Sequence, residues 1–499
     1  MTEAWEALVP RMRELRDLAS AAKLLHWDQS VLMPPGGAEA RAHAMATIES
    51  IAHDKLTDPE IGRLLDELSG NGSLDEVRAS SVRVLKRDYD KATRVPPDLV
   101  RALAEIRGLA YQTWTEARPR SDFSMLEPHL SRFVELKKEE ADALGWEDER
   151  YDALLDDFEP GLKSSQVSEL FDELVAGLKP IVESVLQHVG DPPGFLSGDY
   201  REARQKDFCE WLVAQIGFQG ERGRLDKSPH PFTIGIHKGD IRQTIRTDPS
   251  NLTDSLYAAM HETGHALYEQ GIPDELRDLP VGSAPSLGMH ESQSRLWENH
   301  VGRSRPFAHF LLPKLKERFP EELGMVDLDE FYLGVNHPRR TLIRVTADEL
   351  TYNLHIALRF EIELSMFRGD LDVADLPEAW NDAMERHVGL RPGNDSDGVL
   401  QDMHWSIGGY GYFPTYTIGT LYAAAFFARA EQDLGSLAGD LRAGESRRLL
   451  DWLRENIHAR AYIDEAGDLA TKVLGAPPGA GPYLDYLRVK YGELYDVSL

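Results

Sequence analysis

The sequence contains a single cysteine, Cys209, among its 499 residues. One cysteine excludes an internal disulfide, and such low cysteine use is typical of proteins that stay in a reducing compartment. Cys209 follows Phe208 in a stretch with helical patterning, so we expect it to pack inside the fold and not to act as a nucleophile. These features predict a cytoplasmic protein.

Basic residues are also scarce. The chain has 55 Lys and Arg against 84 Asp and Glu, which gives a net charge of -29. Nucleic-acid backbones and anionic membrane surfaces are bound by clusters of basic side chains. The composition therefore argues against both classes of partner. It does not identify a substrate, because most of these carboxylates are expected on solvated helix faces.

The sequence has no long apolar run. Its first residues lack the basic start and apolar stretch of a signal peptide. The longest uncharged run, residues 406–428, contains Pro414 together with several glycines, tyrosines and threonines. Such a segment is expected to be buried in protein and not to cross a membrane.

Helical periodicity dominates the chain. Residues 1–190 are rich in Ala, Leu, Glu, Arg and Lys and have few β-branched runs. A turn at residues 191–194 follows, and we find no internal repeat and no low-complexity linker. We therefore predict one mainly α-helical domain over residues 1–499, with a helical part at about 1–190 and a catalytic part at about 191–499.

The clear strand signal lies at residues 230–236 and 241–247, which alternate apolar and polar side chains around a turn at 237–240. This predicted hairpin comes just before the motif described next. Its edge could lie along a cleft and pair with an extended peptide. An ordinary solvent-facing hairpin fits the pattern equally well.

Residues 260–268 read M-H-E-T-G-H-A-L-Y, which places the pattern H-E-x-x-H in a predicted amphipathic helix. His261 and His265 are four residues apart, close to one helical turn, so both imidazoles can bind the same metal ion. Glu262 points partly away from them and can accept a proton from a water that the metal activates. Gly271 and Pro273 are typical residues for the end of this helix.

A catalytic zinc site needs a third protein ligand and an open position. Glu269 is excluded, because eight helical residues separate it from His261 by roughly 12 Å. The next predicted helix, residues 287–299, offers Glu291 and Glu298. Spacing alone does not choose between them. We prefer Glu291, which has more polar neighbours.

Two histidines, one carboxylate and Glu262 are the residues that metal-dependent amide hydrolysis requires. The metal lowers the pKa of water to about 7 and polarises a carbonyl group. Glu262 would take the water proton and return it to the leaving amine, without a covalent intermediate.

A third helix is predicted over residues 341–367, where Arg344 and Asp348 would lie one turn apart. In a functional interpretation Arg344 binds a substrate carboxylate and Asp348 orients a ligand histidine. A surface ion pair at i,i+4 spacing explains the same pattern.

Residues 401–405 and the tyrosines at 410, 412 and 416 could supply hydrogen-bond donors to a developing oxyanion. The alternative is a core segment whose hydroxyl groups are satisfied internally. These residues do not choose between the two.

Several stretches together resemble the carboxypeptidase Taq family of metallocarboxypeptidases, in the family's order and across nearly the whole chain. They are W-D-Q with M-P within 27–34, H-P-F at 230–232, D-x-R-x-T at 240–244, H-E-x-x-H at 261–265, H-E-S-Q at 290–293, I-R-x-x-A-D at 343–348 and G-x-x-Q-D-x-H-W at 398–405.

The resemblance implies a mainly α, saddle-like fold with a deep groove and a small sheet beside the active site. It also implies a homodimer that removes single residues from peptide C-termini with broad preference. Its ligands for one Zn²⁺ per subunit, with Co²⁺ as an alternative, would be His261, His265 and Glu291, and Glu262 would be the general base.

By the same resemblance Arg344 would bind the C-terminus of the substrate. The scissile region would be contacted by His230, His404 and Tyr416. Tyr410 and Tyr412 compete with Tyr416 for that role, and we include Tyr412 among the substrate-binding candidates.

Two other functions remain open. A related helical oligopeptidase would cut inside short peptides, and a working Arg344 clamp argues against it. A non-catalytic metal- or peptide-binding protein would not need a base, so Glu262 argues against that function.

Overall fold

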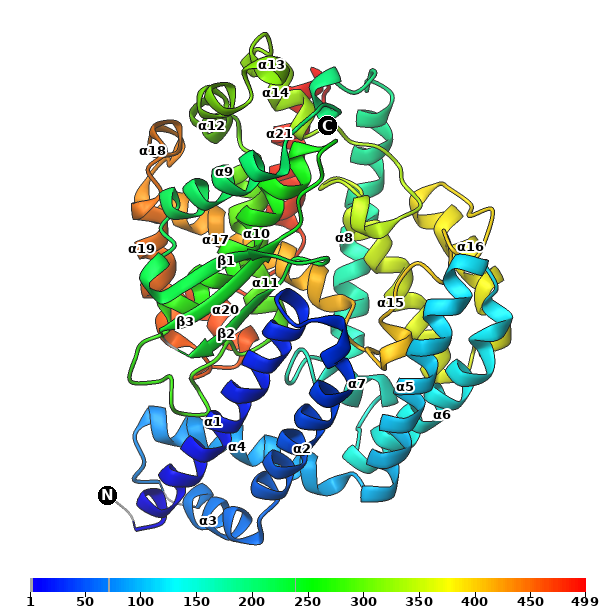
Figure 1. The fold of residues 1–499 in the computed structure, drawn as a ribbon, viewed down its shortest axis with the longest axis vertical. Coiled ribbons are helices and arrows are strands. Elements are labelled where there is room, and N and C mark those ends of the chain that lie inside the picture. The colour runs from blue at the N-terminus through cyan, green and yellow to red at the C-terminus, as the bar shows by residue number, and fades with distance from the viewer. Residues whose placement is uncertain (1–2, 71, 238) are drawn as a thin grey trace.

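The computed structural model describes residues 3–70, 72–237 and 239–499, and it is mostly helical with one small sheet (Figure 1). The helices before the sheet are α1 (Glu3–Val31), α2 (Ala38–Leu56), α3 (Pro59–Ser69), α4 (Glu76–Arg94), α5 (Pro97–Arg120), α6 (Glu127–Leu144), α7 (Arg150–Leu155), α8 (Ser164–Leu186) and α9 (Glu202–Gln215). The prediction of a helical first part is confirmed.

The helices after the sheet are α10 (Leu252–Gly271), α11 (Leu287–Arg295), α12 (Arg305–Arg318), α13 (Pro320–Leu323), α14 (Leu328–Val335), α15 (Tyr352–Arg368), α16 (Leu376–Val388), α17 (Pro414–Leu434), α18 (Ala438–Ala443), α19 (Arg447–Asn456), α20 (Ala466–Leu474) and α21 (Gly481–Tyr495). One apolar cluster joins buried side chains of α5, α6 and α8 with those of α15, α16 and α21. A second joins α9, α10 and α12 with α17, α19 and α20. The first cluster therefore packs residues from both sides of residue 190 together.

The sheet has the order β1-β3-β2, with β1 (Gly223–Lys227), β2 (Thr233–His237) and β3 (Asp240–Ile245). The predicted hairpin is present as antiparallel β2 and β3, although Lys238 in its turn lies outside the described residues. The sequence did not reveal β1, which pairs parallel with β3. Its side chains Arg224, Asp226 and Lys227 are polar, so the strand lacks an apolar alternation.

Helix α10 carries the H-E-x-x-H motif and packs on one face of the sheet. Asn251 caps its start by accepting a hydrogen bond from the Thr253 amide. Ala259 and Ala266 belong to one apolar cluster with Ile241 and Ile245 of β3. Small side chains on α10 thus let the helix lie close to the strand.

Helix α11 packs on the opposite side of α10, where Gly264 makes the contact possible. A Cβ atom at Gly264 would lie 2.6 Å from the Cα atom of Ser294, so any larger residue would push the two helices apart. The predicted second helix is confirmed, and it continues from α11 as a π-helical segment, Leu296–Gly302. π-helical segments are rare and are frequent at functional sites.

The predicted helix at residues 341–367 is wrong at its start. Residues Arg344–Thr346 form a short 3₁₀ turn, and α15 begins only at Tyr352. The Asp348 carboxylate accepts hydrogen bonds from the backbone amides of Leu350 and Thr351, which holds this stretch in a turn ahead of the helix. Arg344 and Asp348 are therefore not one helical turn apart.

The uncharged run at 406–428 is largely buried and mostly belongs to α17, as expected. Within the described ranges, no helix is both long enough and apolar enough to span a bilayer. Cys209 is free and buried on α9, and burial raises the pKa of its thiol to about 12. It packs in the cluster with Ile241 and Ala259, in agreement with the expectation.

Buried His458 is expected to make stability depend on pH. Burial, followed by Arg454, lowers the pKa of His458 from 6.5 to about 3, and its Nε2 lies 2.9 Å from Gln293 Oε1. Below pH 6.5 the unfolded chain binds a proton that the native His458 does not. Stability from this group is therefore lost as the pH falls.

We predict that going from about pH 7.5 to about pH 5 costs wild type on the order of 2 kcal/mol of unfolding free energy through this residue. In His458→Gln the unfolding free energy, measured by urea denaturation at both pH values, should not show this loss. His309→Gln, at an exposed imidazole, is the control and should keep the wild-type slope. Equal slopes for His458→Gln and wild type would contradict the prediction.

Candidate metal centre and active site

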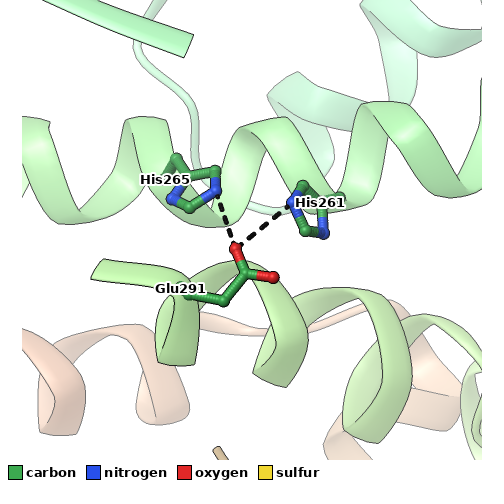
Figure 2. A group of neighbouring side chains, drawn as sticks. All are labelled: His261, His265 and Glu291. Atoms are coloured by element: carbon green, nitrogen blue, oxygen red, sulfur yellow. Dashed lines mark ion pairs between the residues drawn. The ribbon is translucent and has the colours of Figure 1, made fainter. Parts of the chain in front are cut away.

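His261 and His265 extend from α10 toward Glu291 on α11, and one carboxylate oxygen faces both imidazoles (Figure 2). Glu291 Oε2 lies 3.5 Å from His261 Nε2 and 3.3 Å from His265 Nε2. The ligand atoms of the three residues all lie within 4.8 Å of one another. Two imidazole nitrogens and one carboxylate oxygen in this arrangement fit a catalytic transition-metal site of the His₂Glu type.

A second carboxylate orients His261 from the other side of its ring. Glu298, in the π-helical segment, lies 2.9 Å from His261 Nδ1, so the Nε2 atom is left to face Glu291. Although burial opposes both effects, Glu291 and Glu298 raise the pKa of His261 to about 9, and the hydrogen bond to His261 helps lower the pKa of Glu298 to about 2. This arrangement separates the two glutamates that spacing left open. Glu291 belongs to the cluster of possible ligands and Glu298 lies behind His261.

His265 is positioned by stacking. Its ring lies parallel to that of His290 with centroids 4.5 Å apart, and no described residue forms a hydrogen bond to its Nδ1. His290 in turn contacts Glu269, which also pairs with Arg277 at 3.1 Å. Glu269 is thus part of the support behind the candidate metal site, in agreement with its exclusion as a ligand. Burial, followed by the neighbouring His290, lowers the pKa of His265 to about 3.

Glu262 is buried next to strand β2. The Thr233 hydroxyl of β2 donates to Glu262 Oε2 at 2.7 Å and also contacts its backbone oxygen at 2.9 Å. Burial raises the pKa of the Glu262 carboxyl above its usual value, which suits a general base that must release its proton again. The strand therefore fixes one oxygen of the carboxylate and leaves the other for a reacting water.

Glu291 is held rigidly. Arg295 Nε donates to Glu291 Oε1 at 2.7 Å, and the Ser294 hydroxyl donates to Oε2 at 2.8 Å. Helix α17 approaches closely at Gly419, where a Cβ atom would lie 2.6 Å from the Glu291 Cβ. The orientation of this carboxylate is thus set before any metal binds.

Arg344 is buried and belongs to a charge cluster that the sequence did not predict. Its Nη2 donates to Asp402 Oδ1 at 2.8 Å, while Arg359 Nε donates to the other carboxylate oxygen at 2.7 Å. Although burial opposes it, the two guanidinium groups hold the pKa of Asp402 well below its usual range. Two cations against one carboxylate leave a net charge of +1, which can receive a substrate carboxylate.

Aromatic side chains surround Arg344. Its guanidinium carbon lies 5.1 Å from the ring centre of Tyr416, and Tyr412 packs against Tyr416 at 5.3 Å. His404 lies 5.3 Å from Tyr412, and burial lowers the pKa of His404 to about 4. The structure thus brings together four residues predicted to bind substrate: Arg344, His404, Tyr412 and Tyr416. Tyr410 lies elsewhere, in the core against Phe133 and Phe367.

Two other candidates are placed differently. His230 is exposed just before β2 and, among the described residues, is not part of the group of possible metal ligands; its substrate role stays a prediction. Asp348 does not orient a ligand histidine, because its carboxylate accepts bonds from Arg339, Leu350 and Thr351. Glu298 has the position that we expected for Asp348.

Four further site residues were missed by the reasoning from sequence: Thr233, Arg295, Arg359 and Asp402. Asp402 was visible within the Q-D-x-H-W stretch, but its partner Arg344 is 58 residues away in the chain. Arg295 stands four residues after Glu291, the spacing of a helical ion pair, and could have been found by that signal.

Comparison with known proteins gives matches over nearly the whole chain. The family described as carboxypeptidase Taq (M32) metallopeptidase matches residues 7–491. Thermostable carboxypeptidase 1 of Thermus thermophilus is 42% identical over 508 residues, covering 99% of both chains. Thermostable carboxypeptidase 1 of Pyrococcus furiosus is 37% identical, covering 98% of both. The crystal structure of an M32 carboxypeptidase from Deinococcus radiodurans R1 superimposes with a TM-score of 0.97 at 40% identity, covering 99% of this chain and all of that one.

The geometry predicts that Glu298 supports metal binding. In Glu298→Gln the carboxylate that holds His261 Nδ1 is replaced by a neutral amide, so His261 becomes a weaker and less oriented ligand. We expect metal affinity to fall about ten-fold, measured by competition with a chromogenic chelator. Glu361→Gln, at a surface ion pair, is the control and should bind metal as wild type does. Unchanged affinity in Glu298→Gln would refute this role.

Proposed function

The chain belongs to the carboxypeptidase Taq (M32) metallopeptidase family and is a carboxypeptidase, and we propose that it removes single residues from peptide C-termini with Glu262 as the general base. The observation that carries this proposal is the convergence of His261, His265 and Glu291 on one point. Glu262 and the Arg344 cluster add the base and the receptor for a free carboxylate.

His261, His265 and Glu291 would hold the metal, which would supply polarisation of the scissile carbonyl and a more acidic water molecule. Glu262 removes one proton from the attacking water and hands it to the nitrogen of the departing amino acid, so that water and amide become a carboxylic acid and an amine. Thr233 holds the carboxylate of Glu262 during this transfer. Burial keeps bulk water from competing as a proton acceptor.

Arg344 selects the free C-terminal carboxylate of the substrate peptide. Its guanidinium is held by Asp402 and by the Tyr352 hydroxyl, to which Arg344 Nη1 donates at 2.9 Å. With these bonds in place the side chain is preorganised, and a substrate carboxylate pairs with the net positive charge. Tyr412, Tyr416 and His404 line the approach and contact the scissile region in this proposal.

The alternatives are disfavoured. An oligopeptidase that cuts internally has no use for a buried cationic cluster that receives a C-terminal carboxylate, and the named relatives are carboxypeptidases. A binding protein without catalysis does not require a buried carboxylate beside the metal ligands.

Zinc is the metal that we favour, one ion per subunit, with cobalt as the alternative, because two imidazoles and one carboxylate with an open position are typical of catalytic zinc. We extend the proposal to a homodimer in the cytoplasm whose residues 1–499 form a single catalytic domain. The buried free thiol of Cys209 suits a reducing compartment. The apolar cluster that crosses residue 190 supports the single domain.

Glu262→Gln is predicted to separate metal binding from hydrolysis. The amide keeps the shape of the side chain but cannot accept the water proton, so the rate should fall about a thousand-fold or more. Metal content, measured by atomic emission on the purified variant, should stay at the wild-type level. Robust turnover by Glu262→Gln would refute the proposed base.

Arg344→Ala is predicted to remove the preference for free C-termini. Loss of a charge-assisted contact should lower kcat/KM about a hundred-fold on a free-acid peptide. Arg359 still neutralises Asp402 in this variant, so no buried charge is left unpaired. Residual cleavage of the matching C-terminal amide should be unaffected, and Arg368→Ala, at a surface pair, should behave as wild type. Equal losses on acid and amide would contradict the role.

A further inference from the structure

Strand β2 is an edge of the sheet, bonded to β3 on one side only. The Thr244 amide donates to the Phe232 carbonyl, and Thr233 faces Gln243 in the register. In an antiparallel pair, bonded and non-bonded positions alternate. The backbone groups of Thr233 and Gly235 therefore point away from β3, toward any chain that pairs with this edge.

Helix α1 already covers half of that edge. Lys23 Nζ donates to the Gly235 carbonyl at 3.1 Å, and the Ser20 hydroxyl donates to the Ile236 carbonyl at 2.8 Å. For Thr233, in contrast, no hydrogen bond to the outward backbone carbonyl is found among residues 3–70, 72–237 and 239–499. The edge thus offers one free main-chain position and one that is capped.

The cap is firmly built. Figure 1 shows α1 running beside the sheet, and Trp27 fixes it there because its ring centre lies 4.1 Å from the guanidinium carbon of Arg242 and 5.0 Å from that of Arg224. Lys23 also interacts electrostatically with Glu269. The Glu269 side chain lies beside Gly235. A Cβ atom at Gly235 would lie 2.6 Å from Glu269 Oε2, so a larger residue there would displace this carboxylate.

The free position lies at the reaction centre. The Thr233 hydroxyl is 2.7 Å from Glu262 Oε2, so a peptide that pairs with the Thr233 backbone has its reacting bond at the general base. A substrate strand on this edge would reach Gly235 two residues further on. There the Lys23 ammonium already donates a hydrogen bond to the Gly235 carbonyl.

We propose that the Thr233 carbonyl binds the N–H of the substrate residue that precedes the scissile bond, and that Lys23 and Ser20 end strand pairing there. Main-chain recognition then covers one residue upstream of the bond, and the C-terminal carboxylate is read by Arg344. Substrates are accordingly short or unstructured C-terminal segments whose earlier residues are not read. This inference rests on the proposed function.

The test uses penta-alanine and three versions N-methylated at residue 4, 3 or 2, with release of the first C-terminal alanine measured on the metal-loaded wild-type protein. N-methylation at residue 4 removes the N–H that Thr233 would accept and should lower kcat/KM about ten-fold. The N–H of residue 3 points away from β2. The N–H of residue 2 faces the Gly235 carbonyl, to which Lys23 already donates. N-methylation at either position should change kcat/KM less than two-fold.

Lys23→Met frees the Gly235 carbonyl while keeping the length of the side chain, and Glu269 keeps its partners Arg277 and His290. In this variant N-methylation at residue 2 should lower kcat/KM about five-fold relative to unmodified penta-alanine. Ser20→Ala, which frees only the Ile236 carbonyl, is the second variant and should retain the wild-type pattern at residue 4.

If N-methylation at residue 2 lowers kcat/KM of the wild type as much as N-methylation at residue 4 does, the proposed blocking of the Gly235 carbonyl by Lys23 is wrong. An unchanged rate with residue 4 methylated would overturn the pairing with Thr233, and an unchanged residue 2 ratio in Lys23→Met would overturn the role of Lys23. Failure of the wild type to cleave unmodified penta-alanine would instead count against the proposed function. The wild-type series decides the pairing even if Lys23→Met does not fold.

Discussion

The contact between α10 and α11 at Gly264 sets the position of the whole candidate site. A Cβ atom there would lie 2.6 Å from Ser294 Cα, so only glycine permits the approach. At this separation Glu291 faces both imidazoles, and Glu298 reaches the far nitrogen of His261. Metal and catalytic geometry tolerates displacements of only a few tenths of an ångström. The packing of two helix backbones is therefore a precondition for the chemistry.

Buried charges form two groups that share an aromatic side chain. Arg295 pairs with Glu291 at the metal end, and Arg344 pairs with Asp402 at the carboxylate end. Tyr352 lies between them, because its hydroxyl accepts a bond from Arg344 and its ring lies 4.5 Å from the Arg295 guanidinium carbon. Buried ions require such partners. The same partners link the metal ligand Glu291 to the carboxylate receptor Arg344 through Arg295 and Tyr352, which suits an enzyme that acts at a chain end.

The parts of the site that depend on local spacing could be predicted from sequence. The i, i+4 histidines and the adjacent Glu262 follow from helical geometry alone. Spacing alone could not separate Glu291 from Glu298, although the polar neighbours of Glu291 favoured it, because the two lie close together in the chain and their tertiary contacts with His261 distinguish them. Asp402 and Arg344 meet across 58 positions, and no local pattern reports such a pair. The start of α15 was misplaced because Asp348 binds backbone amides ahead of the helix, and β1 was missed because its side chains are polar. The saddle-like shape and deep groove remain predictions from the resemblance.

The most direct test of a metal-dependent carboxypeptidase centred on these residues is mass spectrometry of products from one mixed-sequence peptide and its C-terminal amide. Both are incubated with metal-loaded protein, with chelated protein and with chelated protein resupplied with zinc. We predict a ladder of single-residue losses from the free C-terminus only, abolished by chelation and restored by zinc. Internal fragments from both peptides, or no cleavage by metal-loaded protein, would contradict the account.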